Sequence, residues 1–260
     1  LMFANMAPGD MAFTANVEAE VREQVARWGD HPCLALVNGN NELDVAWANW
    51  GWQEKYTLHG ADSARVWNDH VALFQHRIPA ALKDLCVVPY VHTSPLSNWG
   101  SAAGLRSGDL HYWGVWHGDS AFTAFANNVG RFVSEYGFQS YPDSAVLAQY
   151  IRPEDLFLGS PALAYRQRSY KGDAPIRAAI ERAQGGLPAT LDGFCRASQA
   201  VQAEGYRLAE EAHLAARPRC MGTLFWQLND PWPGPSWSLI DHDGHWKPGL
   251  FAVQEVFAKP

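Results

Sequence analysis

The segment "LVNGNNELD", residues Leu36–Asp44, is an apolar run that ends in two asparagines and a glutamate, Glu42. A second segment, "RFVSEYGFQS" at residues 131–140, has the same form, with Glu135 at the end of its apolar run. Apolar runs without alternation are typical of strands buried on both faces of a parallel sheet. The two segments therefore predict a parallel sheet that carries Glu42 and Glu135 at the carboxyl ends of its strands.

The rest of the chain alternates between strand-like and helix-like patterns. Apolar residues at helical spacing predict helices over residues 17–29, 61–82, 191–216 and 247–259. Short apolar runs predict strands over residues 1–6, 33–38, 84–91, 109–117, 131–137 and 222–230. Alternating strands and helices indicate an α/β fold with a parallel sheet, and in a (β/α)8 barrel the active site lies at the carboxyl ends of the strands.

The spacing of the two glutamates matches whole units of such a barrel. A barrel of about 250 residues has about 31 residues in each βα unit. Glu42 and Glu135 lie 93 residues apart, or three units, and only one strand is predicted before Glu42. We therefore predict an incomplete (β/α)8 TIM barrel that begins near strand 3, with strands 1 and 2 missing. Residues 1–260 would form this single partial catalytic domain, with an insertion at about 142–191.

Composition limits the classes of function. The 260 residues are 47% hydrophobic and carry a formal net charge of -7, which argues against nucleic acid as a partner. Twelve tryptophans suit either a large aromatic core or a sugar site, because the apolar face of a pyranose ring stacks on tryptophan. No apolar stretch approaches the ~18–20 residues of a membrane span, so no membrane partner is predicted. The compartment stays open: cytoplasmic or, in a bacterium, periplasmic or extracellular.

Two carboxyl groups on one rim suit glycoside hydrolysis. One protonates the leaving oxygen and the other attacks the anomeric carbon, at a separation of roughly 5–5.5 Å in retaining enzymes. Glutamates near loops are also commonly solvated or ion-paired. A non-catalytic carbohydrate-binding protein, which would not need the two carboxylates, is therefore an alternative.

Other reaction classes find less support. His111 and His117 are six residues apart, and the segment "DHDGHW" at 241–246 lacks the glutamate of a calcium loop, so neither matches a common metal motif. Ser134 lacks the G-x-S-x-G context of a serine hydrolase, and no dinucleotide-binding motif follows a strand. We predict no metal and no cofactor. The cysteines form no CxxC pair, and Cys33 and Cys86 are predicted to be buried free thiols.

Several motifs together resemble one enzyme family. "NGNNE", "SEYGFQSYP" and "FWQLNDPWPGPSWSLIDHDGHWKP" resemble the catalytic barrel of the family 2 glycoside hydrolases that are β-mannosidases. "TSPLSN" and "GDLHYWGVWHG" look like that family's loops after strands 5 and 6, so the match extends over essentially the whole chain. The resemblance implies an exo-acting enzyme that releases terminal β-D-mannose from a β-mannoside oligosaccharide or glycan with retention of configuration. It also implies β-sandwich domains before the barrel in the parent protein.

The resemblance assigns roles to individual residues. Glu42 would be the general acid/base and Glu135 the nucleophile, while Asn41 would bond the 2-hydroxyl of the sugar and Trp226 would be the sugar platform. His92 and His111 are candidates for bonding substrate hydroxyls or orienting the carboxylates, and further candidates for the pocket wall are Trp47, Trp50, Trp99 and Trp113.

Close relatives of that family remain alternatives. β-Galactosidases, β-glucuronidases and exo-β-glucosaminidases share the barrel and the mechanism, and they differ mainly in contacts to the 2-hydroxyl and the 6-substituent. The sequence around Glu135 and Trp226 favours a mannosidase.

Overall fold

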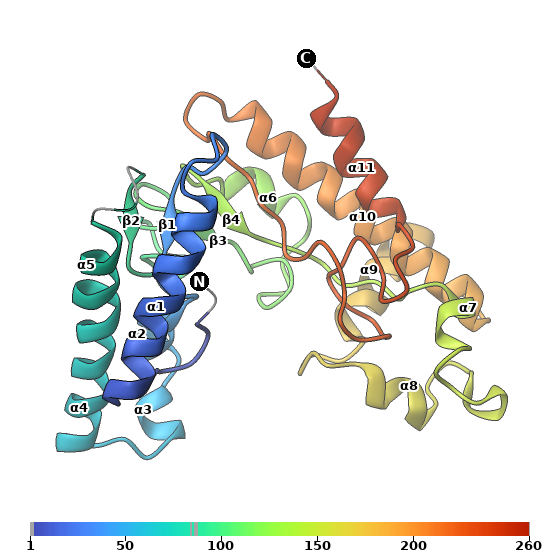
Figure 1. Cartoon of the computed structure of the whole chain (residues 1–260). Helices are drawn as coiled ribbons and strands as arrows, with labels where there is room; N and C mark the ends of the chain where they lie inside the picture. Colours follow the sequence, from blue (N-terminus) through green and yellow to red (C-terminus); the bar gives the residue numbers. More distant parts are fainter. Residues whose placement is uncertain (1–2, 84, 86–87, 260) are drawn as a thin grey trace. The chain divides into compact units, whose positions relative to one another are not determined.

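The computed structural model describes residues 3–83, 85 and 88–259 (Figure 1). The chain divides into two compact units, Leu1–Gly104 and Leu105–Pro260. Cys86 and part of the strand predicted over 84–91 lie outside the described residues.

The first unit begins with helix α1, Met11–Trp28. Asp10 caps its amino end, because one carboxylate oxygen accepts a hydrogen bond of 2.8 Å from the Phe13 N–H. The helix therefore starts before the predicted residue 17. Its buried valines recur every fourth residue, at Val17, Val21 and Val25, and form one wall of the unit's core.

The remaining helices of this unit include one long run. The predicted helix over 61–82 is confirmed as α4 (Gly60–Val71), a π-helical turn η1 (Ala72–Arg77) and α5 (Ile78–Leu82), and α5 packs against α1 (Figure 1). Two short helices, α2 (Leu43–Asn49) and α3 (Trp52–Lys55), follow the first strand. Leu43, Phe74 and Ile78 are fully buried between these elements and the α1 valines.

Strand β1 (Val37–Asn38) pairs in parallel with β2 (Tyr90–Val91). The Gly39 N–H extends this pairing with a 2.9 Å bond to the Val91 carbonyl. A Cβ on Gly39 would lie 2.3 Å from the Tyr90 hydroxyl, so only glycine lets the two strands approach here. The pairing continues to a bridge between Asn41 and Ser94, which brings it to the residue before Glu42.

One predicted strand of this unit is shorter than expected, and another is not formed over its described residues. Residues 33–36 are irregular, so only the last two residues of the 33–38 prediction form a strand, and Cys33 is exposed rather than buried. Residues 3–6 are not a regular strand, although the Phe3 carbonyl accepts a 2.8 Å bond from the Asn41 N–H. The apolar residues predicted burial of these segments, but Cys33, Ala35 and Leu36 are exposed, and a strand also requires a backbone partner along its whole length.

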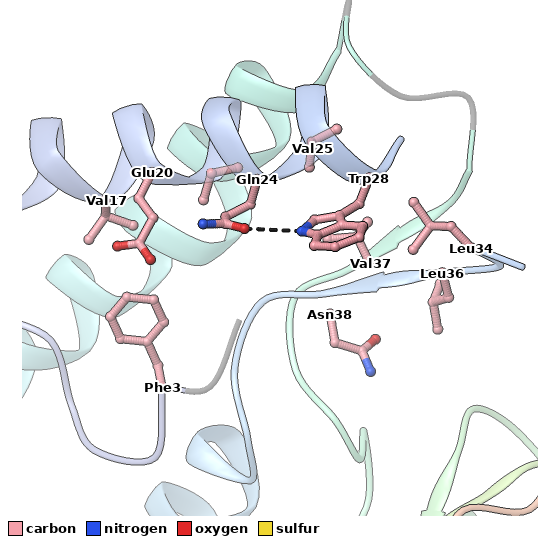
Figure 2. A pocket seen from close by; sticks show the side chains of 11 residues that line it. Phe3, Val17, Glu20, Gln24, Val25, Trp28, Leu34, Leu36, Val37 and Asn38 are labelled. Atoms are coloured by element: carbon pink, nitrogen blue, oxygen red, sulfur yellow. Dashed lines mark hydrogen bonds between the residues drawn. The ribbon is translucent and has the colours of Figure 1, made fainter. Parts of the chain in front are cut away.

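A groove of about 540 Å³ lies between α1 and the segment 34–38 (Figure 2). Its wall is mainly apolar, and on the α1 side the Trp28 indole donates a 3.2 Å bond to the Gln24 side chain one turn away. Among the described residues that line the groove, Glu20 alone is titratable. The groove therefore lacks the two carboxyl groups that glycoside hydrolysis needs.

The second unit contains β3 (Leu110–His111) and β4 (Val133–Glu135), which pair in parallel. The segment 222–226 lies along the other edge of β4, because Leu224 donates a 2.8 Å bond to the Val133 carbonyl. The strand predicted over 222–230 is not continuous. Its first part bonds to β4, whereas Asn229 forms an isolated bridge with Ile240 instead.

Helices make up much of the rest of this unit. The predicted helices α10 (Leu191–Ala215) and α11 (Pro248–Phe257) are confirmed, and they pack against each other (Figure 1). The smaller helices of the unit are α6 (Ala124–Asn127), α7 (Ser144–Leu147), η2 (Pro153–Asp155), α8 (Pro161–Arg166) and α9 (Ala174–Gln184). Those from α7 to α9 fall within the segment 142–191, whose status as an insertion stays a prediction.

The described residues confirm the α/β class. Both strand pairs are parallel, and helices separate their strands along the chain. The strands form two separate two-stranded ladders rather than one continuous sheet. Across the described part of the chain, each helix is too short or too polar to cross a membrane.

Candidate active site

Glu42 occupies the sharp turn between β1 and α2. Its backbone is left-handed, with φ 60° and ψ 10°, which costs a non-glycine residue about 1 kcal/mol. Its N–H donates a 2.8 Å bond to the Ser94 carbonyl, and its own carbonyl accepts a 2.7 Å bond from Ala46. These two bonds fix the direction in which the Glu42 side chain leaves the backbone.

The side chain of Asn40 stabilises this turn through hydrogen bonds. It is buried; the amide nitrogen donates to the His92 carbonyl at 2.7 Å, and the oxygen accepts from the Thr93 hydroxyl at 2.8 Å and from the Leu43 N–H at 3.1 Å. The side chain thus joins the ends of β1 and β2. The neighbouring Asn41 was predicted as a site residue and Asn40 was not, although the repeated asparagines of "NGNNE" were a signal.

His92, a predicted site residue, belongs to a partly buried cluster with Asp44 and His70. Its Nε2 lies 3.2 Å from one oxygen of Asp44, and the Nε2 of His70 lies 2.8 Å from the other. Burial alone would raise the pKa of Asp44, but the hydrogen bonds and charges of the two histidines outweigh it and lower that pKa. Asp44 thereby orients His92. Neither Asp44 nor His70 was predicted. His70 lies on α4, 26 residues after Asp44, so no local sequence pattern connects the two.

The predicted tryptophans of the first unit differ in environment. Trp47 is half-buried and stacks on Trp67 of α4, with ring centroids 5.7 Å apart. Trp50 is 44% exposed and meets the ring of Trp52 edge-on at 6.1 Å. Trp99 is half-buried. Trp47 therefore has a packing role in this unit, and the sugar contacts of all three stay predictions.

Glu135 ends β4 in regular extended backbone and is positioned by side chains. One of its carboxylate oxygens accepts a 3.2 Å bond from the Trp113 indole N–H and lies 3.4 Å from Nδ1 of His111. The side chains of His111 and Glu135 are 2% and 14% exposed, so these contacts are largely shielded from water. The structure brings together three predicted site residues here, and the indole N–H of Trp113 orients the Glu135 carboxylate.

Asp109 extends this cluster along β3. It accepts a 2.6 Å bond from the Ser134 hydroxyl, and the same oxygen lies 3.9 Å from Nε2 of His111. His111 thus has a carboxylate near each ring nitrogen. Asp109 was not predicted, although it lies two residues before His111, on the same face of the strand.

Trp226 lies beside β4. Its N–H donates a 2.9 Å bond to the Tyr136 carbonyl, and its carbonyl accepts a 2.7 Å bond from the Tyr206 hydroxyl. A Cβ on Gly137 would lie 2.3 Å from that carbonyl, so the glycine of "SEYG" permits this approach. The indole of Trp226 is half-buried, and its role as a sugar platform stays a prediction.

The segment 241–246 is held by hydrogen bonds of its own. One oxygen of Asp241 accepts from the backbone N–H groups of Asp243 and His245 at 3.0 and 2.9 Å, which closes the turn. The carboxylate of Asp243 accepts bonds from the side chains of Gln149 and Tyr150 at 2.8 and 2.7 Å. These acidic groups therefore serve as acceptors that fix the loop.

The predicted site residues fall into two groups. Asn41, Glu42, Trp47, Trp50, His92 and Trp99 belong to the first unit, and His111, Trp113, Glu135 and Trp226 belong to the second. Within the first unit, the structure connects Glu42 and His92 through the β1–β2 ladder. Within the second, it brings His111 and Trp113 directly to Glu135.

Comparison with known proteins gives this arrangement a context. No family model matches the chain. The chain is 28% identical over 99% of its length to the β-mannosidase of Mus musculus, and 30% identical over 96% to β-mannosidase B of Thermothelomyces thermophilus. The chain is related to the β-mannosidases. It spans about 31% of the length of these β-mannosidase relatives.

Solved structures agree with this relationship. The β-D-mannosidase of Dictyoglomus thermophilum matches with a TM-score of 0.81 and 27% identity, over 97% of this chain and 30% of that one. An exo-chitosanase, CsxA of Amycolatopsis orientalis, matches with a TM-score of 0.63 and 15% identity, over 95% of this chain and 28% of that one. At that identity the second match shows the fold alone.

Proposed function

We propose that this chain is part of the catalytic domain of a retaining exo-β-mannosidase of glycoside hydrolase family 2. The domain would be an incomplete (β/α)8 barrel that begins near strand 3, and β-sandwich domains would precede it in the parent protein. The observation that carries the proposal is the carboxylate of Glu135 at the end of a parallel strand, with Trp113 and His111 on one of its oxygens, in a chain related to β-mannosidases.

The proposed reaction is a double displacement. Glu42 donates a proton to the departing glycosidic oxygen while Glu135 attacks the anomeric carbon and forms a covalent mannosyl-enzyme. Glu42 then removes a proton from water, which displaces Glu135 and releases mannose in the β configuration. Asn41 would bond the 2-hydroxyl, which is axial in mannose, and Trp226 would support the sugar ring. The reaction needs no metal or cofactor.

The contacts around Glu135 suit a nucleophile. When its oxygen bonds to the anomeric carbon, the carboxylate loses its negative charge, so strong hydrogen bonds to the charged form would oppose the attack. The contacts at 3.2 and 3.4 Å are longer than the usual length for charge-assisted bonds. They orient the carboxylate at little cost to its reactivity.

Two alternatives predict different behaviour. Another family 2 glycosidase, such as an exo-β-glucosaminidase, would use the same two glutamates on a different sugar. A non-catalytic carbohydrate-binding protein would bind glycans through its tryptophans and would tolerate loss of both carboxylates. The identity to β-mannosidases extends over the whole chain, whereas the likeness to the exo-chitosanase lies in the fold, so the mannosidase is the better supported.

The direct test uses the complete gene product that contains this chain. Nitrophenyl β-glycosides of mannose, galactose, glucuronic acid and glucosamine are compared by kcat/KM, and the anomer first released is followed by NMR. We expect the mannoside to be the best substrate, β-mannose to appear first, and a chelator to have no effect. A better rate on another sugar would contradict the specificity, and release of α-mannose would contradict the retaining mechanism.

A further inference from the structure

Tyr170 is an unusual residue of the second unit because its ring is both exposed and held in place. Tyr170 is 79% exposed. Its ring lies parallel to that of His117, with an interplanar angle of 2° and ring centroids 5.5 Å apart. The Tyr170 hydroxyl and Nδ1 of His117 lie 3.0 Å apart, within hydrogen-bond distance. The ring therefore keeps a fixed orientation while much of its surface contacts solvent.

A series of contacts connects this ring to the proposed nucleophile. Trp113 donates to Glu135 at 3.2 Å, and the rings of Trp113 and His117 have centroids 5.3 Å apart. The His117 N–H also donates a 2.8 Å bond to the Trp113 carbonyl, which fixes the two residues on one turn. Tyr170 thus lies two rings beyond Trp113, the residue that donates to Glu135.

The loop that carries Tyr170 is anchored on both sides. On one side, the Trp116 indole donates a 3.3 Å bond to the Ser169 hydroxyl. On the other, the Lys171 ammonium donates to the Asp119 carboxylate at 2.6 Å and to the His117 carbonyl at 3.2 Å. An aromatic ring that is ordered before binding loses little conformational entropy when a ligand stacks on it.

We propose that Tyr170, supported by His117, is a stacking platform for the pyranose ring on the leaving-group side of the scissile bond. The proposal rests on the glycosidase function above and assigns part of its aglycone specificity. A hexopyranose offers an apolar C–H face to an aromatic ring and hydroxyls to polar neighbours. The Asp119 carboxylate, whose side chain is 70% exposed, supplies an acceptor beside the platform.

Tyr165 on α8 provides a matched contrast. It is also exposed, at 65%, and lies on the same stretch of chain. However, the Arg168 guanidinium lies 4.5 Å from its ring centroid, and the ring meets Trp232 at 6.0 Å. Its ring is thus already occupied by protein groups, so it is a control for the loss of an exposed tyrosine.

The test measures aglycone recognition in the complete gene product. β-1,4-Mannobiose has a sugar as its leaving group, whereas β-mannosyl fluoride has none. We expect Tyr170→Ala to lower kcat/KM for mannobiose by about threefold to tenfold and to leave that for the fluoride unchanged. Tyr170→Phe, which keeps the ring, should retain most of the activity on mannobiose. Tyr165→Ala should leave kcat/KM unchanged for both substrates.

The outcomes separate this inference from the proposed function. If Tyr170→Ala lowers kcat/KM for both substrates equally, or for neither, the platform proposal is overturned even when the protein is a mannosidase. If the wild-type protein prefers another glycoside, the mannosidase proposal fails, and the same comparison is made with the disaccharide and fluoride of that sugar. A complete gene product that hydrolyses no glycoside overturns both.

Discussion

The ends of β1 and β4 look alike in sequence, but the structure positions their glutamates in different ways. Glu42 is placed by the backbone, through a left-handed residue whose turn is fastened by the buried Asn40 side chain. Glu135 keeps extended backbone and is placed by side chains, through the N–H of Trp113 and the ring of His111. A similar polar ending therefore does not imply a similar environment.

The difference suits the two proposed roles. A general acid/base gains and loses a proton in each cycle, and Asn40 is neutral, so the turn that holds Glu42 does not depend on the charge of its carboxyl group. A nucleophile must start the reaction ionised, and the indole N–H of Trp113 is a donor that suits that state in Glu135. Two predictions test this contrast and a third compares the two units, in decreasing order of expected effect.

Removing each carboxylate should have the largest effect, and the two losses should differ in kind. We expect Glu135→Ala to lower turnover of every β-mannoside by about 10⁴ to 10⁶-fold. Glu42→Ala should cost about 10² to 10⁴-fold on substrates with poor leaving groups and far less on a dinitrophenyl mannoside, which needs no proton. Steady-state kinetics with both substrate types measure the difference.

Azide identifies which carboxylate is missing. Azide added to Glu135→Ala should give the α-mannosyl azide, whereas azide added to Glu42→Ala should give the β anomer, because the covalent intermediate still forms there. Glu204→Ala, which removes an exposed carboxylate that pairs with Arg207 on α10, is the control and should be fully active. A wild-type rate in Glu135→Ala would refute the mechanism.

Removing the Asn40 side chain should disturb the Glu42 end alone. Asn40→Ala deletes three hydrogen bonds at a buried site, and we expect it to lower the local free energy of opening by about 2–3 kcal/mol. Hydrogen exchange read by mass spectrometry should show faster exchange in peptides from residues 37–49 and no change around β4. Asn49→Ala, at an exposed position at the end of α2, is the control. Equal loosening of both regions would contradict independent positioning.

Mild acid should weaken the second unit before the first. Burial lowers the pKa of His213 from 6.5 to about 4, so between these values the unfolded state binds a proton that the folded state does not. The free energy of unfolding should therefore fall by up to about 3 kcal/mol as pH drops from 6.5 to 4. Burial also raises the pKa of Glu210, which offsets part of this loss above pH 4.5.

The first unit should respond at lower pH. The pKa of Asp44 is lowered from 3.8, so its stabilising effect is complete above that value and is lost only below it. Urea unfolding at pH 7 and pH 5, with hydrogen exchange to separate the units, measures the difference. His213→Gln, which keeps a partner for the Thr223 hydroxyl at 2.9 Å but does not titrate, should reduce the pH dependence. An unchanged pH dependence in this variant would show that another group causes it.

Some elements were predictable because their signal is local. The buried valines of α1 recur at helical spacing, and α10 and α11 carry long amphipathic patterns, so these helices were found. The strand over 222–230 was predicted from its apolar letters, yet only its first part has β4 as a backbone partner. Leu224 and Leu228 of this segment are exposed, so its apolar residues did not show burial, and the hydrogen-bond partners of a strand come from other parts of the chain.

The supporting residues of the site were less predictable than its carboxylates. Several contacting pairs are far apart in sequence: Asp44 and His70 by 26 residues, Ser134 and Asp109 by 25, and His117 and Tyr170 by 53. No spacing rule connects such pairs, because the loops between them set no fixed geometry. Asn40 was adjacent to the predicted Asn41, but which of the two points into the protein depends on the turn at Glu42.

The sequence by itself determined the α/β class, the strand that precedes Glu42 and the strand that ends in Glu135, and the relationship that gives these glutamates their proposed roles. These features depend on residue order and short-range periodicity, which a sequence contains in full. Only the tertiary structure decided that a backbone turn holds Glu42, that Trp113 and His111 hold Glu135, and that Tyr170 is presented beside His117. Each of these is a contact between distant residues, and such contacts exist only once the chain has folded.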